Sequence, residues 1–170
     1  RLAYSRMFMA EVLDFCGERA DWLRDKTVVS LGCGCTGDLG VWPAAVKIAI
    51  DPLLSVYHKL ELLLDDLPGT GATLHLTVGV EDIPLLDDCA DLVLCRNALD
   101  HMPDPGAALK QVSRILRPKG AFFVSVDIGG EPTPDEPTVF SEESLLALVN
   151  DFFDLATPID RAVAHSNNRP

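Results

Sequence analysis

The sequence has no long apolar run and few basic residues. No uninterrupted apolar stretch approaches the roughly 18 residues that a membrane span needs, so no transmembrane helix is expected. Only 14 Lys and Arg stand against 26 Asp and Glu, which gives a formal net charge of −12. An acidic surface repels the phosphates of nucleic acids. We therefore expect neither a nucleic acid nor a membrane as a partner.

Cysteine is scarce and odd in number, with five residues in the chain, at positions 16, 33, 35, 89 and 95. Disulfide frameworks of small secreted domains use even sets of cysteines, so this pattern favours the reduced thiols of a cytoplasmic protein. Cys33 and Cys35 stand one residue apart, which is not the spacing of common zinc motifs, and no second pair follows. No metal site is expected.

Internal repeats are also absent, and 170 residues with 48% hydrophobic content suit one domain with one core. We divide residues 1–170 into a helical cap (1–25), a cofactor-binding core (26–128) and a C-terminal helix and strand (129–170). Strands are predicted at 27–31, 46–50, 72–78, 91–95, 121–127 and 152–164, and helices at 2–24, 38–45, 53–64, 105–116 and from an N-cap at Ser141. Residues 129–137 read as a flexible loop.

Apolar strands that alternate with helices indicate the α/β class, with a doubly wound, mostly parallel sheet flanked by helices. Ligands of such sheets bind beyond the carboxyl ends of the strands, near the point where strand order reverses.

A glycine-rich turn follows the first predicted strand. Residues 28–40 read VVSLGCGCTGDLG, with Gly32, Gly34 and Gly37 spaced G-x-G-x-x-G. Such glycines let a backbone approach a ligand closely. A triphosphate-binding loop would continue with Lys and Ser or Thr, whereas here Asp38 follows and would repel phosphate.

The second predicted strand ends at Asp51, a carboxylate that can accept hydrogen bonds from both hydroxyls of a ribose. NAD and S-adenosylmethionine both carry such a ribose, so Asp51 does not decide between them. A helix-capping role is the alternative.

Three segments in the second half are more specific: VEDIPLLDDCADLVLC (80–95), RNALDHMPDP (96–105) and AALKQVSRILRPKG (107–120). Together with the glycine turn, they resemble the Rossmann-like, class I S-adenosylmethionine-dependent methyltransferases, in particular the branch that acts on small molecules. The similarity covers residues 26–128.

The resemblance implies S-adenosylmethionine as cofactor and gives roles to individual residues. The glycine turn would lie against the methionine part, Asp51 would bond the ribose, Glu81 and Asp82 would meet the adenine, and Asn97 would lie near the methionine. The implied cofactor-binding residues are Gly32, Gly34, Gly37, Asp51, Glu81, Asp82 and Asn97.

The implied activity is transfer of a methyl group to an O or N atom of a small-molecule acceptor. His101 is the candidate catalytic residue, because a neutral imidazole can take the proton of a hydroxyl acceptor. A histidine that bonds the backbone of its own turn is the alternative, and an amine acceptor would need no strong base. Two other functions stay open: a non-catalytic domain that binds the cofactor or a partner, and a nicotinamide oxidoreductase.

The sequence departs from the family's pattern at several places. Ser30 stands where an acid is usual, and the glycine loop is one residue longer than the common form. The helix expected at 38–45 is short and contains Pro43, which limits its length. The sequence ends at Pro170, where the family continues into a seventh, antiparallel strand, so that strand is either absent or not included.

Overall fold

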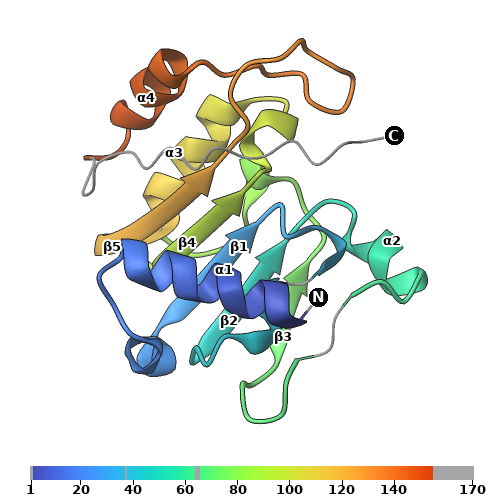
Figure 1. Ribbon diagram of the computed structural model, residues 1–170, viewed down its shortest axis with the longest axis vertical. Helices are drawn as coiled ribbons and strands as arrows, with labels where there is room; N and C mark the ends of the chain where they lie inside the picture. The colour runs from blue at the N-terminus through green and yellow to red at the C-terminus, as the bar shows by residue number, and fades with distance from the viewer. Residues whose placement is uncertain (1, 37, 64–65, 155–170) are drawn as a thin grey trace.

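The computed structural model of the chain describes residues 2–36, 38–63 and 66–154. Its centre is one sheet of five parallel strands in the order β3-β2-β1-β4-β5 (Figure 1). The strands are β1 (Thr27–Leu31), β2 (Val46–Ile50), β3 (Thr73–Leu76), β4 (Ala90–Arg96) and β5 (Leu116–Ser125). Strand order reverses between β1 and β4, so the doubly wound α/β fold is confirmed.

Both faces of the central strands are covered. Alternating side chains send Val28 and Leu92 to one face and Val29 and Val93 to the other. On the first face lie α1 (Leu2–Phe15), η1 (Ala20–Asp25) and η3 (Asp38–Val41), and on the second lie η4 (Val80–Asp82), α3 (Pro105–Ile115) and α4 (Glu142–Asn150). Figure 1 shows α1 crossing the front of the sheet.

The N-terminal helix is fixed to the sheet by an aromatic cluster. Phe8 of α1 is buried and packs edge-on against Trp42 and Phe123, with ring centroids 6.1 and 5.7 Å away. Such aromatic pairs stabilise the fold by more than their buried area alone would. The helical region predicted at 2–24 forms two pieces, α1 and η1, and these rings hold α1 against the sheet.

The two later helices, α3 and α4, begin at capped positions. The Asp104 carboxylate accepts a hydrogen bond from the Ala107 amide at 2.9 Å, and Pro105 opens α3. Ser141 Oγ accepts from the Ser144 amide at 3.0 Å while Ser144 Oγ accepts from the Ser141 amide at 2.9 Å. This reciprocal pair confirms Ser141 as the N-cap of α4.

Several predicted elements differ from the structure. The helix expected at 38–45 is wrong, because this region holds only the short 3₁₀ turn η3 before Pro43; a second 3₁₀ turn, η2 (Gly34–Thr36), precedes it in the glycine turn. The helix expected at 53–64 is only α2 (Leu54–Lys59). The Arg-Pro-Lys-Gly segment at 117–120 lies within β5, where the register with β4 shifts, instead of separating helix from strand. Residues 152–154 are not a strand, and the rest of the strand predicted at 152–164 lies outside the described residues.

Within the described part of the chain, no helix is both long enough and apolar enough to cross a bilayer.

Candidate functional site

The turns after β1 and β4 meet at the point where strand order reverses. Gly32 has φ +59°, and its amide donates to the Ile50 carbonyl at 2.8 Å. A Cβ added to Gly32 would lie 2.4 Å from the Cβ of Ala98. Only glycine fits both the backbone conformation and this close approach. The glycine turn and the segment that follows β4 therefore lie together at the carboxyl edge of the sheet, where the site is predicted.

We expect Gly32→Ala to destabilise the protein more than Gly34→Ala does. Gly34 also has a left-handed φ of +60°, but nothing lies within 4 Å of the Cβ it lacks. Both variants incur about 1–2 kcal/mol for the backbone conformation, and Gly32→Ala adds the contact with Ala98. Urea unfolding of the two variants measures the difference in their free energies of unfolding. Equal losses in the two variants would contradict the close approach of Gly32 to Ala98.

Asp51 joins the end of β2 to the glycine turn. Its Oδ2 accepts from the Gly34 amide at 3.0 Å and its Oδ1 accepts from the Leu53 amide at 2.8 Å. The carboxylate is 7% exposed. Each oxygen can accept a further hydrogen bond. The N-cap of α2 is Leu53 and not Asp51, so the bond to the Leu53 amide lies in the turn before the helix, and the ribose role of Asp51 stays a prediction. Gly37, the third glycine of the motif, lies outside the described residues.

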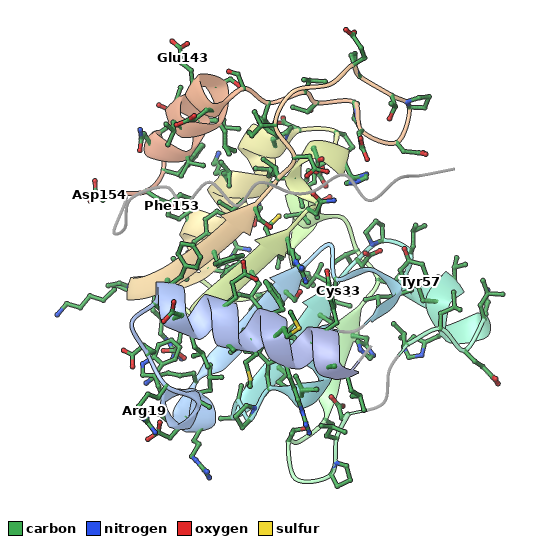
Figure 2. The ribbon with its side chains drawn as sticks, in the orientation of Figure 1. Arg19, Cys33, Tyr57, Glu143, Phe153 and Asp154 are labelled. Atoms are coloured by element: carbon green, nitrogen blue, oxygen red, sulfur yellow. The ribbon has the colours of Figure 1, made fainter. Side chains whose placement is uncertain are left out.

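Tyr57 of α2 stands beside this turn. Figure 2 shows Tyr57 on α2 and Cys33 just after β1. Burial raises the pKa of the half-buried Tyr57 hydroxyl, and the neighbouring Asp51, Cys35 and Cys33 raise it further. The hydroxyl therefore keeps its proton near neutral pH and stays a hydrogen-bond donor.

Glu81 and Asp82 differ in orientation. Glu81 is half-buried, and its Oε1 is shielded from solvent with no hydrogen-bond partner among the described residues. Its other oxygen, Oε2, lies 2.8 Å from where a Cβ of Gly79 would be. Asp82 is exposed. Since a buried acceptor needs a donor, Glu81 is the better placed of the two to receive an amine or hydroxyl of a ligand.

Asn97 directly follows β4 in a left-handed conformation, with φ +46°. Its amide donates to the Ser125 carbonyl at 2.7 Å, which ties it to the end of β5, and its side chain is exposed. The structure thus places Asn97 one residue from Ala98, the neighbour of Gly32.

His101 lies in η5 (Leu99–His101) and contacts a distant loop. Its Nδ1 is 2.7 Å from the carbonyl oxygen of Asp135. A carbonyl only accepts hydrogen bonds, so Nδ1 carries a proton and Nε2 of the neutral ring keeps its lone pair. Nε2 is 3.9 Å from Glu136 Oε1. The alternative of a bond to its own turn is not what the structure describes, and residues 129–137, predicted as flexible, are held at this point.

Asp100 is not among the predicted site residues. Only 4% of it is exposed, and its Oδ1 has no hydrogen-bond partner in the described part of the chain. Burial raises the pKa of this carboxyl, and the charges of Glu136 and Asp127 raise it further. Asp100 stands next to His101 in the sequence, and the Thr138 amide, far along the chain, donates to the Asp100 carbonyl at 3.3 Å.

Comparison with known proteins gives a consistent result. A family described as "Methyltransferase domain" matches residues 30–124, more than half of the chain. An uncharacterized methyltransferase of Mycobacterium bovis is 38% identical over 109 residues, covering 61% of this chain and 42% of the relative. The ubiquinone biosynthesis O-methyltransferase of Aeromonas salmonicida is 25% identical over 145 residues, covering 77% of this chain and 58% of the relative.

Among solved structures, the fold is similar to an S-adenosylmethionine-dependent methyltransferase of Thermotoga maritima described as a possible histamine N-methyltransferase. The TM-score is 0.55 at 23% identity, covering 88% of this chain and 74% of that one. The chain spans about half the length of the two curated relatives named above. On the family match and the shared fold, the chain belongs to the class I S-adenosylmethionine-dependent methyltransferases, whose cofactor is S-adenosylmethionine.

Proposed function

We propose that the protein binds S-adenosylmethionine at the carboxyl edge of the sheet and transfers its methyl group to an oxygen or nitrogen atom of a small molecule. The observation that carries this proposal is the link from the Asp51 carboxylate to the Gly34 amide. It places a two-oxygen acceptor directly beside Gly34, where the turn is open, and this suits an uncharged sugar diol better than a phosphate.

The residues of this edge fit the cofactor in their chemistry. Gly34 leaves its side of the turn open. Glu81 offers an unpartnered buried oxygen, which suits the exocyclic amine of an adenine. Asn97 presents an exposed amide next to the turn. Asp51 would hold the ribose and Glu81 the adenine, and the glycine turn and Asn97 would lie against the methionine part.

The chemistry that the cofactor supplies is a methyl group on a positively charged sulfur, open to in-line displacement. The protein's part is to bind, orient and keep water out. With a hydroxyl acceptor, Nε2 of His101 would take the proton, while the Asp135 carbonyl holds the ring in the required tautomer.

Two relatives support an O or N acceptor by their descriptions, one as an O-methyltransferase of ubiquinone biosynthesis and one as a possible histamine N-methyltransferase.

Thermal shift with S-adenosylmethionine, S-adenosylhomocysteine and NADH is the first test. The two adenosyl ligands should raise the melting temperature by mass action and NADH should not. Transfer of labelled methyl into small molecules of a cell extract is the second test. A response to NADH alone would overturn the proposal.

Asp51→Ala should weaken the binding of S-adenosylhomocysteine about 10- to 150-fold, since a hydrogen bond to a charged group contributes roughly 1.5–3 kcal/mol. Isothermal titration calorimetry measures the affinity. Glu143→Gln is the matched control, because it removes a carboxylate from the exposed side of α4 (Figure 2). Unchanged affinity in folded Asp51→Ala would remove Asp51 from the site.

One observation favours a second function, a cofactor-binding domain without turnover. Between β1 and β2 the described residues contain only the 3₁₀ turns η2 and η3, with no α-helix to follow the glycine turn. Binding of S-adenosylmethionine without methyl transfer to any acceptor fraction would favour this reading over catalysis.

A further inference from the structure

Arg96, the last residue of β4, holds its guanidinium against two aromatic rings of α1. Its Cζ lies 4.3 Å from the ring centroid of Tyr4 and 4.4 Å from that of Phe8. Alternation along β4 directs Arg96 to the face that α1 covers, the same face as Leu92 and Leu94. The ring contacts place the charged group and use none of its N–H donors in hydrogen bonds.

Those donors are unused within the described residues. Nη1 is shielded from solvent and has no hydrogen-bond partner, and Arg96 takes part in no ion pair there. Arg114 and Arg117, by contrast, are each paired with an aspartate at 2.7 Å. A half-buried cation without a carboxylate is unexpected in a chain with 26 acidic residues. A ligand anion would satisfy it.

The position of Arg96 joins it to the proposed site. Its strand neighbour on β5 is Ser125, and the preceding Cys95 pairs with Leu31, the residue before Gly32. Arg96 therefore lies at the carboxyl edge, between the glycine turn and the end of β5. Asn97, on the proposed cofactor side, comes next in the chain.

The wall beside Arg96 is apolar. The Tyr4 ring that contacts the guanidinium is 48% exposed, and Met7, one helical turn further along α1, is 71% exposed. Both side chains belong to the helix whose Tyr4 and Phe8 rings contact the guanidinium. Their chemistry suits an apolar or aromatic skeleton that carries one anionic group.

We propose that Arg96 binds a carboxylate of the methyl acceptor, so that the acceptor is a small apolar or aromatic carboxylic acid. This rests on the proposed methyltransferase function and names its substrate class. Arginine suits the role because its planar fork can donate two hydrogen bonds to one carboxylate.

Benzoate and benzamide are the probes, since they differ in charge and share shape. Each is titrated by calorimetry into protein saturated with S-adenosylhomocysteine. Wild-type protein should bind benzoate at least about tenfold more tightly than benzamide. Arg96→Met should reduce this ratio to about one, Arg96→Lys should retain part of it, and Arg6→Met, which removes an exposed arginine of α1, should retain all of it. Circular dichroism checks that each variant is folded.

Equal binding of the two probes to the wild type, no binding of benzoate, or a ratio that persists in Arg96→Met would overturn the proposal. A second arm compares S-adenosylmethionine with its decarboxylated form. If Arg96→Met weakens only the carboxylated form, Arg96 holds the cofactor's carboxylate and the assignment to the acceptor is wrong. Failure of the proposed function would show instead as no binding of S-adenosylhomocysteine to the wild type, before either probe is added.

Discussion

Asp66→Ala should lower the free energy of unfolding by about 3–5 kcal/mol, because it leaves a buried ammonium without its counter-ion. Lys47 of β2 is 1% exposed, and its Nζ lies 2.7 Å from Asp66 Oδ1. Among the residues that the structure describes, the other hydrogen-bond partner of the ammonium is the Thr70 hydroxyl, at 3.3 Å. The Asp66 carboxylate also accepts from the Thr73 amide and hydroxyl. Urea denaturation measures the loss.

The matched variants separate charge from packing. Lys47→Met removes the cation and keeps an apolar stem, so we expect a smaller loss than in Asp66→Ala. The double variant should recover much of the stability that Asp66→Ala loses, since a buried pair replaced by apolar groups is often close to neutral. If the loss of unfolding free energy in the double variant equalled the sum of the losses in the two single variants, the role given to the ion pair would be contradicted.

The Asp66 carboxylate also makes the stability of the fold depend on pH. Burial would raise the pKa of Asp66, but hydrogen bonds from Lys47 and Thr73 and the charge of Lys47 hold it below its ordinary value of 3.8. The stability that this group contributes is therefore full above pH 3.8 and is lost as the pH falls through the lower folded value. Asp66→Asn should lack this component of acid denaturation.

This ion pair lies near the amino ends of β2 and β3, whereas the proposed site is at their carboxyl ends. Lys47 is the second residue of β2, and Thr73 is the first of β3. Variants here should consequently change stability and leave the affinity for S-adenosylhomocysteine close to that of the wild type.

Short-range patterns predicted the fold well. Residues 27–31 and 46–50 form strands with the predicted bounds, and Ser141 caps its helix. These features depend on apolar runs and caps that are local in sequence. The prediction failed at 117–120, where Pro and Gly chemistry suggested a break, because pairing with β4 continues β5 through an irregular register that no local signal encodes.

The site was only partly predictable for the same reason. Gly32 and Asp51 follow strands, so strand order alone brings them to one edge. The contact of Gly32 with Ala98, the stacking of Arg96 on Tyr4 and the burial of Asp100 each join segments far apart in the chain. A single sequence offers no signal for such pairs.

His101→Ala should lower the turnover of a hydroxyl acceptor by about a hundred- to ten-thousand-fold, the usual contribution of a positioned general base. The affinity for S-adenosylhomocysteine should stay unchanged, because the ring contacts the loop at Asp135 and Glu136, apart from the glycine turn. Single-turnover transfer of labelled methyl measures the rate, and calorimetry measures the affinity.

His101→Asn distinguishes a base from an anchor of the loop. An asparagine amide can still donate to the Asp135 carbonyl from near the position of Nδ1, but it has no basic nitrogen in place of Nε2. If His101 is the general base, turnover in His101→Asn should be as low as in His101→Ala. Added imidazole should then restore part of the rate in the alanine variant. Recovery of turnover in His101→Asn would instead make His101 a positioning residue for residues 129–137. Full activity in both variants would indicate an acceptor, such as an amine, whose proton needs no protein base.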